Sequence, residues 1–516
     1  MNARIFSAFL FVIMSGALFA EKYDLVLLNG RVIDPETKLD AVRHVAIDDG
    51  KIVAISEEVI EGAQSLDVSG MVVAPGFIDI HAHGMNLGDM RMQAMQGVTT
   101  ILELESGVLP IAPWYDIMEA QQTPLNYGAS AGWTYSRIEN FSGKKAEPTL
   151  EYFQAAQGAT DWKLDVAEPL LLGEILGSVE QGLKEGALGI GINAGYAPGY
   201  GQKEYFALAE LAAKYGVGTF THVRYASIIE PQGSFEAVKE LIANSALTGA
   251  HMHLCHINST SLTDIHATLD LVDKARKKGI KVTVEAYPYG AANTVVGAAM
   301  FSGSDWRERM HSSANNFQLG KKRMTEEELS SYQKDKPGTM ITWHFLDEDK
   351  PEDLALLDAS ITHPDVMIAS DSVFWSYFDE NGDVKTYAGE QWPLPDKVFS
   401  HPRSSGTFAK ILRSYVRERK LLGLSEAIKK MTLMPAQVLE EFVPQMKKKG
   451  RVQVGMDADI VVFDPAKISD RATHENANQV AVGVSAVLVN GEFVLRGGSL
   501  VLEADSGRAV RREVSK

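Results

Sequence analysis

The chain has 516 residues, of which 45% are hydrophobic and 23% are charged, and 44 are glycine. This composition excludes collagen-like, low-complexity and largely disordered proteins. Lys and Arg number 50 against 67 Asp and Glu, and the resulting net charge of −17 argues against nucleic-acid binding because it repels phosphate backbones. The single cysteine, Cys255, excludes an intrachain disulfide framework and a Cys-rich zinc site, so His and carboxylate side chains must hold any metal.

The first 20 residues have the pattern of a secretory signal peptide. Arg4 is the only basic residue before Lys22, an apolar run covers 5–19, and small residues gather at its end. The run is shorter than the roughly 20 residues that a membrane span needs. We therefore expect a chain exported to the periplasm or the medium without a stable membrane anchor.

The two ends of the chain share a sequence pattern that is typical of β-strands and hairpin turns. Short apolar runs within 23–67 are broken by Asn29-Gly30 and Asp49-Gly50, which are typical of hairpin turns. The same pattern returns after Gly450, with another turn signal at Asn490-Gly491. These patterns predict a small β-sandwich domain that is built from 21–70 and 446–516.

The middle of the chain, 71–445, alternates strand-like runs with helical periodicity. The predicted strands are 76–83, 98–105, 125–130, 188–193, 218–223, 251–258, 281–287 and 366–371. Eight strands separated by helices predict the α/β class and a (β/α)8 TIM-like barrel. The link from the seventh strand to the eighth is too long for a plain connection, so an insertion at about 296–364 is expected to cover the catalytic face.

Residues that can bind metals fall at the ends of five predicted strands. His81 and His83 close the first strand two residues apart, so alternation places both on one face. The others are Glu103 and Glu105 on the second strand, His222 on the fifth, His256 on the sixth and Asp371 on the eighth. The carboxyl ends of barrel strands meet on one face, where barrel enzymes hold their sites. Histidine and carboxylate ligands suit a borderline cation such as zinc.

The segment Val-Ala-Pro-Gly-Phe-Ile-Asp-Ile-His-Ala-His at 73–83 resembles the first metal-binding motif of the amidohydrolase superfamily. Further motifs resemble its N-acyl-D-amino-acid deacylase (D-aminoacylase) branch. They are Gly-Val-Thr-Thr at 97–100, Gly-Ala-Leu-Gly at 186–189, Tyr-Ala-Pro-Gly at 196–199, Thr-His-Val-Arg at 221–224, Tyr-Pro-Tyr at 287–289, His-Pro-Arg at 401–403 and Gly-Met-Asp-Ala-Asp at 455–459. The resemblance covers nearly the whole chain after the predicted signal peptide.

The resemblance implies a metal site with one or two divalent ions, with zinc expected. It assigns His81 and His83 to the more exposed ion and His222 and His256 to the tighter one. Asp371 would be both a ligand and the catalytic acid/base. The branch usually places a metal-binding Cys on the second strand, but the matching residue here is Ser106, a poor ligand. A carboxylate is expected to bridge instead, Glu105 ahead of Glu103 because it lies nearer the end of the strand.

The resemblance also implies a small substrate with an amide bond and a carboxylate. Arg224, Tyr287 and Arg403 are expected to bind that carboxylate, together with Asn258, which stands where the branch commonly has Lys. We expect a metal-dependent hydrolase of N-acyl amino acids, with the D configuration favoured by resemblance alone. Two alternatives remain: hydrolysis of cyclic amides or dipeptides within the superfamily, and a non-catalytic binding protein. A binding protein is disfavoured because the predicted ligands and Asp371 are all present.

Overall fold

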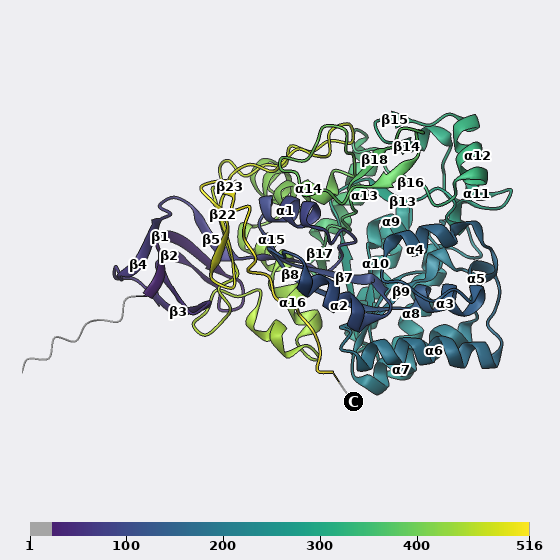
Figure 1. The fold of residues 1–516 in the computed structure, drawn as a ribbon, viewed down its shortest axis with the longest axis horizontal. Helices are drawn as coiled ribbons and strands as arrows, with labels where there is room; N and C mark the ends of the chain where they lie inside the picture. Colours follow the sequence, from purple (N-terminus) through teal and green to yellow (C-terminus); the bar gives the residue numbers. More distant parts are fainter. Residues whose placement is uncertain (1–22, 515–516) are drawn as a thin grey trace, which may run out of the picture.

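A computed structural model describes residues 23–514, and the predicted signal peptide lies outside them. Strands from both chain ends share one nine-stranded sheet, and eight parallel strands between them form a second sheet that is curved into a barrel (Figure 1). The predicted fold class is therefore confirmed. Within 23–514, every helix is too short or too polar to cross a bilayer.

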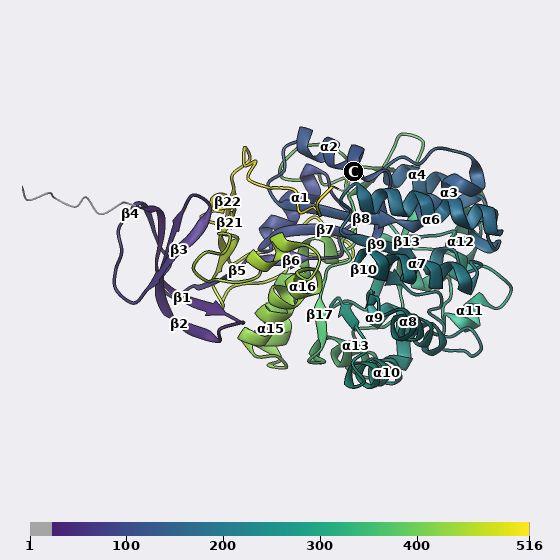
Figure 2. The same cartoon turned by 90° about the horizontal axis from the view of Figure 1, so that it is seen from below.

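The nine-stranded sheet joins residues that lie almost 400 positions apart. Its strands are β1 (Tyr23–Asp34), β2 (Leu39–Asp48), β3 (Lys51–Ser56), β4 (Gly62–Asp67), β5 (Val72–Pro75), β20 (Ile460–Phe463), β21 (Val484–Val489), β22 (Glu492–Arg496) and β23 (Ser499–Leu500). The two ends meet where β5 pairs antiparallel with β20, with Val73 opposite Val462. Leu27 and Val45 from one end pack with Leu488 from the other in a single buried core, and both views show the two ends side by side (Figures 1 and 2).

Two of the three predicted turns are confirmed. Asp49-Gly50 and Asn490-Gly491 connect neighbouring antiparallel strands with positive φ at both residues, as a tight hairpin turn requires. The turn predicted at Asn29-Gly30 is wrong, because β1 runs through it as an irregularity in its pairing with β2. Asn29 has a φ of 61°, which asparagine tolerates. Asn29 therefore lies in a bulge of the strand instead of a turn.

All eight predicted barrel strands are present. They are β6 (Phe77–Asp79), β7 (Val98–Val108), β8 (Asn126–Gly132), β9 (Gly189–Asn193), β10 (Gly218–His222), β11 (His251–Leu254), β12 (Val282–Ala286) and β17 (Val366–Ile368), hydrogen-bonded in that order. The first and last strands meet beyond their ends, where the backbone N–H of His83 donates to the carbonyl of Ser372 at 2.8 Å. This contact brings the segment that carries His81 and His83 beside the segment that carries Asp371.

Helices surround the barrel. They are α1 (Leu87–Met95), α2 (Ile111–Ala120), α3 (Trp133–Ser142), α4 (Leu150–Ala155), α5 (Asp161–Leu164), α6 (Pro169–Lys184), α7 (Gln202–Tyr215), α8 (Ser234–Thr248), α9 (Ile257–Ser261), α10 (Ile265–Lys277), α13 (Pro351–Thr362), α14 (Arg403–Lys410), α15 (Leu424–Met431) and α16 (Leu433–Leu439). α7 buries Leu208 and Ala212 and is followed by Gly216, whose φ of 62° is a left-handed cap.

The long link between β12 and β17 carries a small sheet of its own. Its elements are β13 (Ala291–Val295), α11 (Trp306–Arg309), β14 (Phe317–Leu319), β15 (Lys322–Arg323), α12 (Glu326–Asp335) and β16 (Met340–His344). Phe301, Trp306, Phe317 and Trp343 form its core. A short hairpin, β18 (Ser376–Phe378) and β19 (Val384–Thr386), follows β17.

A buried polar network fastens the nine-stranded sheet to the barrel. Asp459 accepts a hydrogen bond from Asn126 of β8 at 3.0 Å and pairs with Lys449 at 2.7 Å. Its second oxygen accepts the backbone N–H of Asn490 at 2.8 Å. Because the carboxylate is buried and fully partnered, it holds the two sheets in one fixed arrangement.

Candidate metal centre

Backbone hydrogen bonds on both sides fix the segment that follows β6. Between His81 and His83, the N–H of Ala82 donates to the carbonyl of Leu102 on β7 at 3.1 Å. The two imidazoles project the same way, as alternation predicts, and their Nε2 atoms lie 3.2 Å apart. Both rings therefore present Nε2 to one point at the carboxyl end of the barrel.

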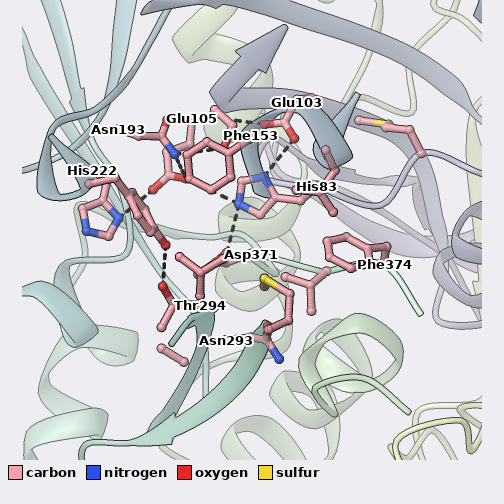
Figure 3. A pocket seen from close by; sticks show the side chains of 18 of the residues that line it. His83, Glu103, Glu105, Phe153, Asn193, His222, Asn293, Thr294, Asp371 and Phe374 are labelled. Atoms are coloured by element: carbon pink, nitrogen blue, oxygen red, sulfur yellow. Dashed lines mark hydrogen bonds and ion pairs between the residues drawn. The ribbon is translucent and has the colours of Figure 1, made fainter. Parts of the chain in front are cut away.

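The carboxylate of Glu105 lies between two pairs of histidines. Its Oε1 is 3.0 Å from Nδ1 of His222 and 2.8 Å from Nε2 of His256. Its Oε2 is 3.4 Å from Nε2 of both His81 and His83. Figure 3 shows Glu105 between His83 and His222, with Asp371 facing the same space. One buried carboxylate thus spans both histidine pairs, the geometry expected of a bridging ligand.

Asp371 completes the group from the segment that follows β17, beside His81 and His83. Its Oδ1 lies 3.4 Å from Nε2 of both His81 and His83, and 2.8 Å from Nη2 of Arg403, which is fully buried. The structure therefore brings together all six residues that were predicted to bind metal.

Two of these residues have unusual backbone conformations. His256 and Asp371 have φ values of 31° and 50°, in the left-handed region that ordinary residues avoid. The strands predicted over 251–258 and 366–371 accordingly end earlier, at Leu254 and Ile368. Strain of this kind is typical of functional residues that the surrounding structure holds in place.

Carboxylates behind the histidines set their orientation. Glu103 accepts a hydrogen bond from Nδ1 of His83 at 2.8 Å, and Glu285 binds Nδ1 of His81. Glu285 also contacts Nε2 of His253 at 3.0 Å. When Nδ1 of His81 or His83 carries the proton, Nε2 is left free to bind a metal. Glu285 was not predicted from the sequence, although a carboxylate between Val284 and Ala286 in an apolar strand indicates a buried polar role.

Neighbouring cationic groups lower the pKa values of the two carboxylates in the site, Glu105 and Asp371. Burial alone would raise the pKa of Glu105, but His81, His222 and His256 outweigh it and hold that pKa well below its usual range. Burial would also raise the pKa of Asp371, but Arg403 together with the histidines lowers that pKa overall. Both carboxylates are therefore ionised and can act as ligands or proton acceptors.

The donor atoms fit a divalent metal site. His81, His83 and Asp371 form one group whose ligand atoms all lie within 4.8 Å of one another, and His81, Glu105 and His256 form a second. Imidazole nitrogens and carboxylate oxygens at such spacing suit zinc and similar ions.

Of the four predicted carboxylate contacts, only Arg403 reaches this point, where it pairs with Asp371. Arg224 pairs with Glu240 at 2.8 Å and stacks on the ring of Tyr200. Tyr287 is buried beneath Arg403, whose guanidinium lies 4.7 Å from its ring centre.

The last of the four, Asn258, lies in the first turn of the short helix α9 instead of ending a strand. Its amide nitrogen donates to the carbonyl of Tyr287 at 3.0 Å.

A cavity of about 330 Å³ opens above the metal-binding residues. His83, Glu105, His222, His256 and Asp371 form its floor, and residues of β13, β16 and the loop after β17 form much of its wall. The insertion thus forms part of the wall of the cavity through Met300, Met340 and Trp343.

The family model for the amidohydrolase family matches residues 72–494. The chain is 27% identical to an N-acyl-D-glutamate deacylase of Alcaligenes xylosoxydans xylosoxydans, over 91% of this chain and 93% of that protein. It is 25% identical to a D-aminoacylase of the same organism, over 92% and 94%.

Two solved structures share the fold over 95% of this chain and all of theirs. An N-acyl-D-glutamate deacylase of Bordetella bronchiseptica, complexed with zinc and a phosphonate inhibitor, matches with a TM-score of 0.72 and 24% identity. A D-aminoacylase matches with a TM-score of 0.75 and 22% identity.

Proposed function

Because the chain belongs to the amidohydrolase family, we propose that it hydrolyses the amide bond of N-acyl amino acids at a metal centre, with N-acyl-D-amino acids as the favoured series. The observation that carries this proposal is the carboxylate of Glu105 between two histidine pairs, with Asp371 facing the same cavity. The relatives that match nine-tenths of the chain are named N-acyl-D-glutamate deacylase, D-aminoacylase and N-acyl-D-aspartate deacylase, and these names support the substrate class. Hydrolysis of cyclic amides has no comparable support.

The chain's own residues define where metal would bind. His81, His83 and Asp371 would hold one ion, His222 and His256 a second, and Glu105 would bridge them. Zinc suits this donor set, and the zinc named for the Bordetella bronchiseptica deacylase supports the choice. When bound, such an ion lowers the pKa of a water and polarises the scissile carbonyl.

Asp371 is placed to move the protons of the reaction. Its carboxylate faces the cavity and would accept a proton from the attacking water, then donate it to the departing nitrogen. Arg403 is a positioning residue, since its ion pair holds this carboxylate in one orientation. Glu103 and Glu285 would keep His83 and His81 in the tautomer that binds metal.

The proposal is tested by loading the purified chain with zinc and measuring amine release from paired N-acyl-D and N-acyl-L amino acids. We expect amine release from the D series and at least about tenfold less from the L series. An enzyme site distinguishes even closely related substrates by about this factor. A chain that binds zinc and releases amine from neither series would contradict the proposal.

We further propose that the chain is exported through its first 20 residues, on the support of their sequence pattern alone. N-terminal sequencing of protein from the periplasm or medium is expected to begin near Glu21. A Val12→Asp variant, which interrupts the apolar run with a charge, should stay uncleaved inside the cell. An uncleaved wild-type chain would show that the segment is no signal.

A further inference from the structure

The cavity above the metal-binding residues has an unusual charge balance. Among the described residues that line it, none is Lys or Arg. Its lining carboxylates are Asp89, Glu103, Glu105, Glu151 and Asp371. Bound metal would neutralise Glu105 and Asp371 on the floor, but the space beyond the floor offers no cation to a substrate.

The rest of the lining is dominated by large apolar side chains. This apolar wall comprises Met85, Trp114, Tyr135, Phe153, Tyr196, Met300, Met340, Trp343 and Phe374. It begins at the metal site itself, because the ring of Tyr196 lies 5.1 Å from that of His222 and Phe153 packs edge-on against Tyr196 at 5.5 Å. A group that extends from the scissile bond therefore meets aromatic and methionine surface.

Most neutral polar side chains in the lining already have partners, and the amide oxygens of Asn193 and Asn293, which have none among the described residues, are acceptors that would not bind a carboxylate. The hydroxyls of Tyr196 and Thr294 are hydrogen-bonded at 2.8 Å, and the amide nitrogen of Asn193 donates to Ser106 at 2.9 Å. The hydroxyl of Ser259 lies 3.1 Å from Nδ1 of His256. A carboxylate brought into this space would lose water, find few free donors and approach other carboxylates.

We propose that, apart from the α-carboxylate, the acyl group and the amino-acid side chain of the substrate are uncharged and apolar, and that substrates with a second carboxylate are excluded. The α-carboxylate is exempt because an N-acyl amino acid carries it on the carbon next to the scissile nitrogen, which a productive pose would place at the metal floor. This inference rests on the proposed function and makes it more specific. It also separates this chain from relatives that are named for N-acyl-D-glutamate and N-acyl-D-aspartate.

The test compares substrates of similar size that differ in one charge. With zinc-loaded protein, N-acetyl-D-methionine is compared with N-acetyl-D-glutamate, and N-butyryl-D-leucine with N-succinyl-D-leucine. We expect kcat/KM to favour the neutral member of each pair by about 100-fold or more, the discrimination that an unpaired buried charge produces. Equal kcat/KM within the pairs would overturn the inference and leave the proposed function intact.

A binding measurement separates this inference from the proposed function. Calorimetry on the zinc-loaded Asp371→Asn variant measures Kd without turnover, and we expect the same preference for neutral ligands. If no substrate is turned over but the Kd order holds, the proposed function fails and the charge selection stands. Equal Kd values within the pairs would overturn the charge selection.

Adding a cation to the cavity should relax the exclusion. Glu151 lies exposed at the start of α4 and lines the cavity, so its replacement does not disturb the core. Glu151→Lys is expected to raise the glutamate-to-methionine ratio of kcat/KM roughly tenfold, and the matched Glu151→Gln variant by less, since only lysine adds a positive charge. Met340→Lys against Met340→Gln repeats the comparison on the apolar wall. Unchanged ratios in both lysine variants would contradict the inference.

Discussion

Replacing Glu105 with glutamine is expected to weaken metal binding by more than about 100-fold, because loss of an outer partner of a ligand alone costs roughly 10- to 100-fold. The variant keeps the size of the side chain and removes the charge that faces all four histidines. Amide hydrolysis should fall with the metal content. Metal analysis after dialysis, with circular dichroism to verify folding, measures the effect.

The matched control is Glu103→Gln, two residues away on the same strand and the same face. Glu103 contacts Nδ1 of His83 and lies outside the space between the histidine pairs. Its replacement should therefore weaken metal binding less, by roughly 10- to 100-fold. If Glu103→Gln lost more metal than Glu105→Gln, the bridging role would belong to Glu103.

This pair also shows what the sequence could and could not predict. Alternation places Glu103 and Glu105 on one face of the strand, so the choice between them rested only on which lay nearer its end. The structure separates them by the direction of each side chain, towards the outer nitrogen of His83 or into the space between the histidines. Such directions depend on packing between strands and leave no periodic trace in the sequence.

The barrel and its ligands were predictable because they follow local periodicity. Five of the six metal-binding residues end or follow a strand, Glu105 lies near the end of β7, and strand ends can be located from apolar runs. The substrate contacts were less predictable because they lie beyond the strand ends. His222 and Arg224 would share a face if β10 continued, but β10 ends at His222, and Arg224 turns to Glu240 on α8. Asn258 is turned by the left-handed backbone at His256 in the same way.

Asp371→Asn is expected to lower kcat by roughly 10²- to 10⁴-fold while much of the metal stays bound. Asparagine preserves the shape of the side chain and keeps one oxygen as a ligand, but it cannot accept the proton of the attacking water. The remaining ligands, His81, His83 and Glu105 among them, are untouched. Steady-state rates and metal content measured on the same preparation separate the two effects.

Arg403 provides the control that distinguishes proton transfer from positioning. An Arg403→Lys variant keeps a positive charge near Asp371 but loses the planar guanidinium that pairs with its Oδ1 and stacks on Tyr287. It should lower kcat less than Asp371→Asn and keep its pH profile, since the proton-accepting carboxylate is still present. If Asp371→Asn kept its metal and wild-type kcat, Asp371 would not be the acid/base and would serve as a ligand alone.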